Sequence, residues 1–125
     1  MKHKAKRILI IDDSITNVIL LDAILGNRGY EIIKTSSVKE ALPFMGHTLP
    51  DLILLDLLMP RVSGYKFLED IRKNERTKNI PVMIVTAVIE KESKIKTQKL
   101  GIIDYIEKPI DIHALIEKVE ETLNN

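Results

Sequence analysis

Residues 50–68, "PDLILLDLLMPRVSGYKFL", hold a short aliphatic run that ends on a charged side chain. The run at residues 52–55 is apolar at every position, which is typical of a strand buried on both faces of a sheet. Asp56 follows directly, although an unpaired charge costs much free energy when it is buried. The stretch therefore predicts a covered, parallel sheet, and a carboxylate at the end of such a strand needs a functional reason.

Similar aliphatic runs alternate with amphipathic stretches along the whole chain. We predict strands at residues 7–11, 31–35, 52–55, 82–85 and 105–107, and helices at residues 15–28, 64–73, 89–100 and 112–123. A further helix opens at Ser37 with Glu40 in capping-box spacing, and Pro43 predicts either a kink in it or an early end. Ser63 and Asp111 are the expected N-caps of the helices that follow them.

The alternation of strands and helices decides the fold class. Right-handed crossovers between successive strands place helices on both faces of the sheet. We therefore expect a doubly wound α/β fold with about five parallel strands, of the flavodoxin-like type. In such sheets, ligands bind beyond the carboxyl ends of the strands, at the point where the strand order reverses.

Length and composition are those of one globular domain, residues 1–125. The 19 Lys and Arg residues balance 18 Asp and Glu residues, so no overall field favours nucleic acid or a membrane surface. The chain has no cysteine, no signal-peptide apolar core and no run near the ~20 apolar residues that cross a bilayer. We expect a cytoplasmic protein without direct nucleic-acid contact or membrane insertion.

Polar side chains follow four of the predicted strands. These residues are Asp12 and Asp13 after the first strand, Asp56 after the third, Thr86 after the fourth and Lys108 after the fifth. Each has a structural explanation when taken alone, because acidic residues also cap helices and Lys-Pro pairs are common in loops. Five coincidences on one edge of a sheet favour a shared site instead.

The chemistry of this set points to phosphoryl transfer. Clustered carboxylates repel one another, and a hard cation with oxygen ligands, such as Mg²⁺, relieves that repulsion. An ammonium and a hydroxyl suit phosphoryl oxygens, and a carboxylate nucleophile can form an aspartyl phosphate. The first strand lacks the Gly-rich turn of a nucleotide site, and the three histidines are too scattered for a metal triad. We therefore predict phosphoryl transfer onto Asp56.

At this point the chain resembles the receiver domain of bacterial response regulators. The resemblance is carried by "ILIIDDS", "LILLDLLMPRVSG", "VMIVTA" and "DYIEKPI", and it covers nearly the whole chain. It implies that Asp56 is the phosphoacceptor, which receives its phosphoryl group from a phosphohistidine of a histidine kinase or histidine phosphotransferase. It also implies that Lys108 contacts the phosphoryl group, that Thr86 and Tyr105 form a switch, and that the peptide before Pro109 is cis.

The resemblance further implies a bound Mg²⁺ or Mn²⁺. Asp13 and Asp56 would ligate the ion directly with the main-chain carbonyl of Leu58, and Asp12 would hold a metal-bound water. Leu58 and Val88 depart from the commoner family pattern. The position of Leu58 is often polar in relatives, and Val88 is apolar as well. Both flank the path of a hydrolytic water, so we expect a comparatively long-lived aspartyl phosphate.

Two surfaces are expected to meet partner proteins. In the helix at residues 15–28, Val18, Leu21, Ile24 and Leu25 form the stripe that faces the sheet. Asn17 and Leu20 are then candidates for docking onto a helical bundle that carries the donor histidine, although Leu20 could instead pack against the last helix. The fourth helix, fifth strand and fifth helix correspond to the output face of the family, so we expect an unknown downstream protein to bind there.

Other functions remain open at the level of sequence. A pseudo-receiver that binds partners without being phosphorylated is the main alternative, but it is expected to lack one of the acids, the Thr or the Lys. A phosphohydrolase would need a second carboxylate where Leu58 stands. A receiver catalyses its own phosphorylation and dephosphorylation yet acts primarily as a switch. We expect a stand-alone regulator, and a piece of a hybrid kinase or larger regulator is the other possibility.

Overall fold

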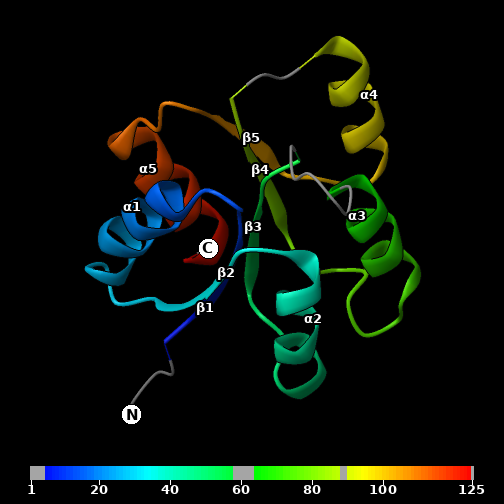
Figure 1. Cartoon of the computed structure of the whole chain (residues 1–125), viewed down its shortest axis with the longest axis horizontal. Helices are drawn as coiled ribbons and strands as arrows, with labels where there is room; N and C mark the ends of the chain where they lie inside the picture. Colours follow the sequence, from blue (N-terminus) through cyan, green and yellow to red (C-terminus); the bar gives the residue numbers. More distant parts are fainter. Residues whose placement is uncertain (1–4, 58–63, 88–89, 125) are drawn as a thin grey trace.

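The computed structural model describes residues 5–57, 64–87 and 90–124, in which strands and helices alternate (Figure 1). The strands are β1 (Arg7–Ile11), β2 (Glu31–Thr35), β3 (Leu52–Leu55), β4 (Val82–Thr86) and β5 (Asp104–Glu107). The helices are α1 (Ile15–Gly26), α2 (Val38–His47), α3 (Gly64–Lys73), α4 (Lys91–Lys99) and α5 (Ile112–Leu123). None of the described helices is long and apolar enough to cross a membrane.

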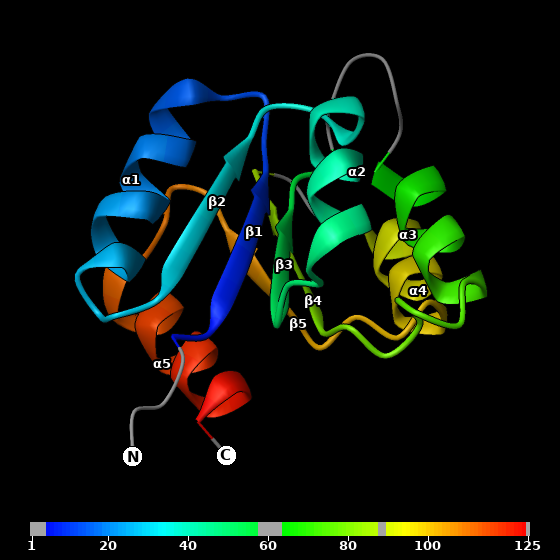
Figure 2. The same cartoon turned by 90° about the horizontal axis from the view of Figure 1, so that it is seen from below.

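The strands form one parallel sheet in the order β2-β1-β3-β4-β5. Helices α1 and α5 cover one face, and α2, α3 and α4 cover the other (Figure 2). The chain steps outward from β1 to β2 and then returns to the other side of β1, so the strand order reverses between β1 and β3. The predicted doubly wound α/β class is confirmed, and its ligand-binding position lies beyond the ends of β1 and β3.

Two cores, one on each face of the sheet, explain the continuous apolar runs. In β3, Ile53 and Leu55 pack in the cluster that includes α2 and α3, whereas Leu52 and Leu54 pack in the cluster that includes α1 and α5. All four side chains are buried, because each face of the strand meets helices. A polar side chain has no place in this strand until the strand ends, which is where Asp56 stands.

Helix α2 differs most from its prediction. It continues through Pro43 to His47, so the early end that we considered is wrong. Proline removes one helical N–H bond, but α2 buries side chains on both sides of it, Ala41 and Met45 among them. Ser37 caps the helix as predicted, accepting from the Glu40 N–H at 3.1 Å.

The remaining helix ends lie within a few residues of their predicted positions. Helix α1 ends at Gly26 rather than residue 28, and Gly29 has the positive φ of 89° that only glycine adopts easily. Asp111 caps α5 by accepting from the Ala114 N–H at 3.0 Å. Ser63, the predicted cap of α3, lies outside the described residues.

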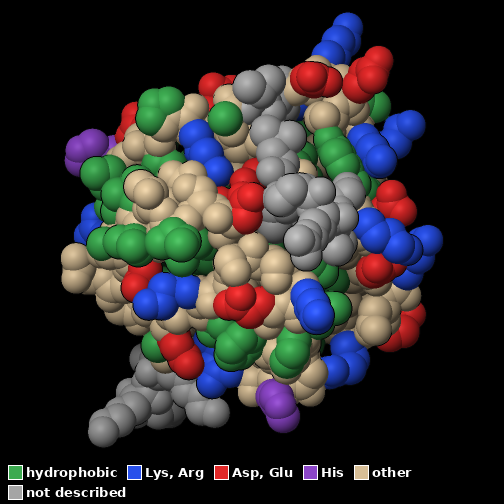
Figure 3. Space-filling view, in the orientation of Figure 1, with side chains coloured by type: hydrophobic (Ala, Val, Ile, Leu, Met, Phe, Trp, Pro, Cys, Tyr) green, Lys and Arg blue, Asp and Glu red, His purple; other side chains and the backbone are tan. Residues whose placement is uncertain are grey.

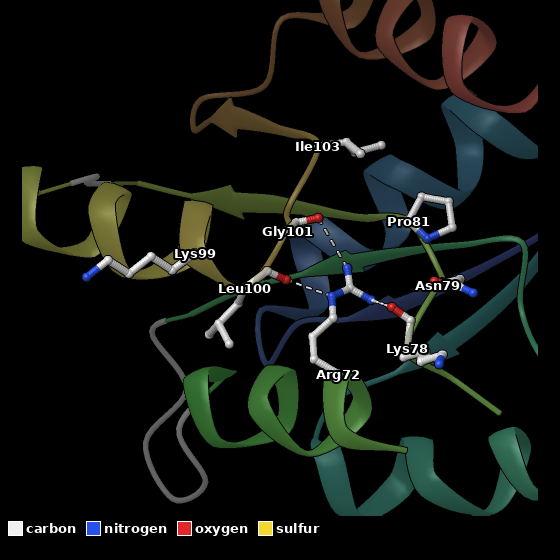
Figure 4. A pocket seen from close by; sticks show the side chains of 8 residues that line it. All are labelled: Arg72, Lys78, Asn79, Pro81, Lys99, Leu100, Gly101 and Ile103. Carbon is white, nitrogen blue, oxygen red and sulfur yellow. Dashed lines mark hydrogen bonds between the residues drawn. The ribbon is translucent and has the colours of Figure 1, made fainter. Parts of the chain in front are cut away.

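Arg72 of α3 fastens the loop between α4 and β5 at the far end of the sheet (Figure 4). Its guanidinium donates to the carbonyl oxygens of Leu100 at 2.6 Å and Gly101 at 3.3 Å. It also donates to those of Lys78 at 3.0 Å and Ile80 at 2.8 Å, just before β4. Burial lowers the pKa of Arg72 from its ordinary value. One side chain thus holds α3, the start of β4 and the end of α4 together.

Candidate functional site

Three carboxylates meet beyond the point where the strand order reverses. Asp12 follows β1 and Asp56 follows β3, and these strands are paired with Ile11 opposite Leu55. Asp12, Asp13 and Asp56 each place a carboxylate oxygen within 4.8 Å of the others. Asp12 and Asp56 are buried, whereas Asp13 is exposed. The structure therefore brings together the three acids that we selected from separate strand ends.

Lys108 extends from the end of β5 into this cluster. Its Nζ lies 3.0 Å from Asp12 Oδ2 and 3.4 Å from Asp56 Oδ2. The Lys108 N–H donates to the Thr86 carbonyl at 2.9 Å, which fixes the start of the loop, and the Lys108–Pro109 peptide is cis. Within residues 5–57, 64–87 and 90–124, Lys108 thus forms ion pairs with two of the three clustered carboxylates, Asp12 and Asp56.

The pKa of the Asp12 carboxyl reflects both its burial and its charged neighbours. Burial raises the pKa of the Asp12 carboxyl above its ordinary value, and the nearby charge of Asp56 raises it further. The N–H of Ser14, which donates to Asp12 Oδ1 at 2.9 Å, and the ammonium of Lys108 lower the pKa but do not cancel the effect of burial. A bound cation would favour the ionised form, so the donor set and its charge fit a hard divalent ion.

Thr86 supplies a buried hydroxyl beside the cluster. It is the last residue of β4, which lies between β3 and β5 in the sheet, and it has no exposed surface. Its Oγ1 has no hydrogen-bond partner among the described residues. Such a group costs free energy in a folded protein, which indicates that the site is arranged for a ligand that supplies the missing bond.

Tyr105 is bonded to α4 and not to Thr86. Its hydroxyl donates to the Lys94 carbonyl at 3.1 Å and shares a short hydrogen bond with Thr97 Oγ1. The ring is partly buried and packs against the core on the side of α2 and α3. Both members of the expected switch are thus present, with the tyrosine held by a helix.

The face of α1 that meets the sheet is as predicted. Leu21 and Leu25 are fully buried, and Val18 and Ile24 are partly buried against the same core. The most exposed large apolar side chains of α1 are Ile15, at 72%, and Ile19, at 62%, whereas the two docking candidates, Asn17 and Leu20, are partly exposed. Figure 3 shows hydrophobic side chains gathered over this part of the molecule.

Some predicted site residues lie outside the described part of the chain, and the structure adds others that the sequence did not indicate. Leu58 and Val88, the residues proposed to control water access, lie outside the described residues, as does the Leu58 carbonyl. Conversely, sequence reasoning missed Gly64, where an added Cβ would lie 3.0 Å from the Asp56 carbonyl oxygen. It also did not assign Ile15 and Ile19 to the exposed face, although the angle of 100° per residue sets both well away from the buried stripe.

Comparisons with known proteins agree with this geometry. The chain matches the response regulator receiver domain family over residues 8–120. It is 32% identical over 117 residues to protein PilH of Pseudomonas aeruginosa, covering 94% of this chain and 97% of that protein. It is 34% identical over 120 residues to the polar-differentiation response regulator DivK of Brucella abortus, covering 96% and 98%.

A solved structure extends the likeness to three dimensions. A putative response regulator from Chloroflexus aurantiacus superimposes with a TM-score of 0.89 at 32% identity, over 98% of this chain and 100% of that one. The chain therefore belongs to the response regulator receiver domain family. It is a phosphoacceptor signalling domain of two-component systems. Receiver domains generally bind Mg²⁺ at an acidic pocket, which here corresponds to the cluster of Asp12, Asp13 and Asp56.

Proposed function

We propose that this receiver domain accepts its phosphoryl group on Asp56 from a phosphohistidine of a histidine kinase or histidine phosphotransferase. The observation that carries the assignment is the position of Asp56: it is buried at the end of β3, with Lys108 Nζ at 3.4 Å. In the transfer, an Asp56 carboxylate oxygen forms the new P–O bond while the P–N bond to the donor imidazole breaks, and the electron pair stays on that nitrogen.

Lys108 and Thr86 have distinct roles in this proposal. The Lys108 ammonium stabilises the charge on the phosphoryl oxygens once it exchanges part of its contact with Asp12 and Asp56 for them. Thr86 Oγ1, buried and without a partner among the described residues, donates a hydrogen bond to one of those oxygens. The arrival of a phosphoryl group thus provides an acceptor for a hydroxyl that the described part of the chain leaves unpaired.

Asp12, Asp13 and Asp56 are the residues that we propose to hold Mg²⁺ or Mn²⁺. Asp13 and Asp56 would be direct ligands together with the carbonyl of Leu58, and Asp12 would act through a bound water. Support comes from the three carboxylate oxygens that lie within 4.8 Å of one another, and from the pKa of Asp12, which burial and the nearby charge of Asp56 raise. When bound, such an ion neutralises the acids and the transferred group.

We propose that Thr86 and Tyr105 convert this local event into a change of surface. When the Thr86 hydroxyl moves to a phosphoryl oxygen, the space it leaves becomes available to the Tyr105 ring. Tyr105 lies between α4, which its hydroxyl contacts, and α5, from which Lys118 Nζ donates to its carbonyl at 2.7 Å. A shift of the ring therefore alters the surface of α4, β5 and α5, to which an unknown downstream protein would bind.

The donor protein is proposed to dock on α1. Asn17 and Leu20 lie on this helix, and the exposed Ile15 and Ile19 enlarge the apolar surface in the first two turns of the helix that follows Asp12 and Asp13. A helical bundle that carries the donor histidine would pack against this apolar surface. If Leu20 instead serves only to pack against α5, Ile15 and Ile19 remain available for that contact.

The water-access role of Leu58 and Val88, the cytoplasmic location and the single domain over residues 1–125 remain predictions.

The main alternative to a phosphoacceptor is an interaction module that is never phosphorylated. No observation favours it, because the acids and the ammonium lie together and the buried Thr86 hydroxyl ends the neighbouring strand β4. Phosphoryl labelling separates the two.

The test is intact-mass measurement after incubation with acetyl phosphate and Mg²⁺. We expect one added phosphoryl group on the natural protein, none on Asp56→Asn, and normal labelling of Asp70→Asn, which changes an exposed carboxylate on α3. In a second arm, Ile19→Glu should slow transfer from a phosphorylated histidine phosphotransferase while acetyl phosphate still labels it. Full labelling of Asp56→Asn contradicts the acceptor assignment, and unchanged transfer to Ile19→Glu contradicts docking on α1.

A further inference from the structure

Thr97 is a fully buried polar residue in an otherwise charged helix. Helix α4 carries lysine at four of its nine positions, and Thr97 is its only buried residue. The Thr97 hydroxyl donates to the Ser93 carbonyl at 2.8 Å, one turn earlier in the same helix. Its single proton is thereby used, and its oxygen is free to accept the hydrogen bond of Tyr105.

The hydroxyl of Tyr105 therefore acts as the donor toward α4. It has two acceptors within reach, Thr97 Oγ1 and the Lys94 carbonyl, the latter at 3.1 Å. The Lys94 ammonium also lies 5.8 Å from the centre of the Tyr105 ring, within the range of a cation–π contact. Three groups of one helix thus hold the tyrosine that the proposed function makes a switch.

The end of α4 that carries Thr97 is itself fastened to the rest of the protein. The N–H groups of Leu100 and Ile102 donate to the Thr97 carbonyl, at 3.0 and 3.4 Å. The Leu100 carbonyl in turn accepts from Arg72 at 2.6 Å (Figure 4). Thr97 therefore offers the tyrosine an acceptor whose position is set by α3 as well as by its own helix.

The position held by Thr97 is not the one that a phosphoryl group is proposed to favour. Tyr105 pairs across β4 and β5 with Ile84, whereas Thr86 pairs with Glu107 and its Oγ1 has no partner among the described residues. A tyrosine that follows the Thr86 hydroxyl has to give up the bond to Thr97. The Tyr105 hydroxyl therefore cannot keep its hydrogen bonds to α4 while the ring takes the position proposed for the phosphorylated state.

We infer that Thr97 is a positioning residue that latches Tyr105 onto α4 and thereby opposes the phosphorylated state of the switch. This inference rests on the proposed role of Thr86 and Tyr105. Because a ligand that selects one of two states binds more weakly when the other state is stabilised, the latch lowers the apparent affinity for a phosphoryl group or its mimic. Removing one hydrogen bond of ordinary strength shifts such an equilibrium by about fivefold.

The test compares variants by titration with beryllofluoride in the presence of Mg²⁺, with the ring signals of ¹³C-labelled tyrosine as the readout. The chain has three tyrosines, so Tyr30 and Tyr65 serve as internal references and Tyr105→Phe assigns the third signal. Thr97→Val keeps the shape of the side chain and removes its hydroxyl. We expect it to bind beryllofluoride about fivefold more tightly than the natural protein, with a shifted Tyr105 signal already in the free protein.

Two controls separate a latch from a purely structural role. Thr97→Ser restores the hydroxyl and should return both readouts to near the natural values. Thr122→Val removes a hydroxyl that donates to the carbonyl four residues earlier in α5, at 2.9 Å, so it matches the helical bond of Thr97 without touching Tyr105. It should leave both readouts unchanged. Adding Thr97→Val to Tyr105→Phe should bring no further gain in affinity, because the shared bond is already gone.

Unchanged affinity and an unchanged free-state Tyr105 signal in Thr97→Val would overturn the latch. A gain in affinity that is equally large in Thr122→Val would also overturn it, since it would reflect general loosening. If the natural protein itself fails to bind beryllofluoride, the proposed function fails. The free-state signal of Tyr105 then still reports whether Thr97 holds the ring.

Discussion

Replacing Gly64 with alanine tests how closely α3 approaches the acceptor residue. Gly64 is the first residue of α3 and is buried. An added Cβ would lie 3.0 Å from the Asp56 carbonyl oxygen, 3.1 Å from Leu57 Cα and 3.2 Å from Leu57 Cδ2. The two nearest of these atoms belong to the backbone, so no rotation of a side chain relieves them, and either α3 or the segment after β3 has to move.

The magnitude follows from two opposing effects. Forcing an extra carbon into a packed site costs about 1–3 kcal/mol. Exchanging glycine for alanine in a helix returns at most about 1 kcal/mol, because the unfolded chain loses conformational freedom. We therefore expect Gly64→Ala to lower the free energy of unfolding by roughly 0–2 kcal/mol, with a central value of about 1 kcal/mol. Displacement of the Asp56 main chain should also slow labelling by acetyl phosphate.

The chain offers a matched control in α2. A Cβ at Gly46 would meet no atom within 4 Å, so Gly46→Ala adds a methyl group to open space within a helix. It should raise the free energy of unfolding by about 0.5–1 kcal/mol and leave labelling unchanged. Urea unfolding of both variants and the natural protein gives the comparison. A Gly64→Ala protein as stable as the natural one and labelled at the same rate would refute the steric argument.

Two further predictions concern the acids and the life of the phosphate. Burial raises the pKa of Asp12 in the folded protein. At pH values just above the ordinary pKa of a carboxyl group, the folded state therefore binds more protons than the unfolded state. Stability of the metal-free protein therefore falls as the pH rises through that window, and Asp12→Asn should unfold at higher urea than the natural protein at neutral pH in EDTA. The advantage should shrink in acid, and an equal difference at both pH values would contradict this reasoning. At fixed Mg²⁺ and pH, Leu58→Asn or Val88→Glu should shorten the phosphate lifetime. A barrier change of ~1.4 kcal/mol corresponds to about tenfold, and unchanged decay in both variants would rule out control of water access by these side chains.

The fold was predictable because its signals are local in the sequence. A strand covered on both faces must be apolar at every position, so the run from Leu52 to Leu55 could be recognised without knowing its neighbours. Strands that alternate with helices must run parallel, and parallel strands end on the same edge. Asp12 and Asp56 could therefore be placed together before any contact was known, and the structure puts both in one cluster.

Local signals were weaker where packing competes with them. Pro43 is an unfavourable residue inside a helix, yet α2 continues past it because side chains on both sides of it are buried. The apolar residues of α1 were visible in the sequence, but the exposure of Ile15 and Ile19 depends on how the helix lies on the sheet.

Contacts between elements far apart in the chain could not be predicted from residue patterns. Lys108 could be assigned to the site, but its distances of 3.0 and 3.4 Å to two carboxylates depend on the positions of three strands. Gly64 lies against the Asp56 carbonyl, and Arg72 reaches the carbonyl of Leu100, through packing that no spacing along the chain encodes. Thr97 belongs to a segment whose charges indicate a solvated helix, and its buried bond to Tyr105 arises because α4 packs beside β5. Residue patterns carry secondary structure and the ends of strands, whereas the pairing of a hydroxyl, a carbonyl or a Cβ with its neighbour is settled by how the helices and the sheet pack together.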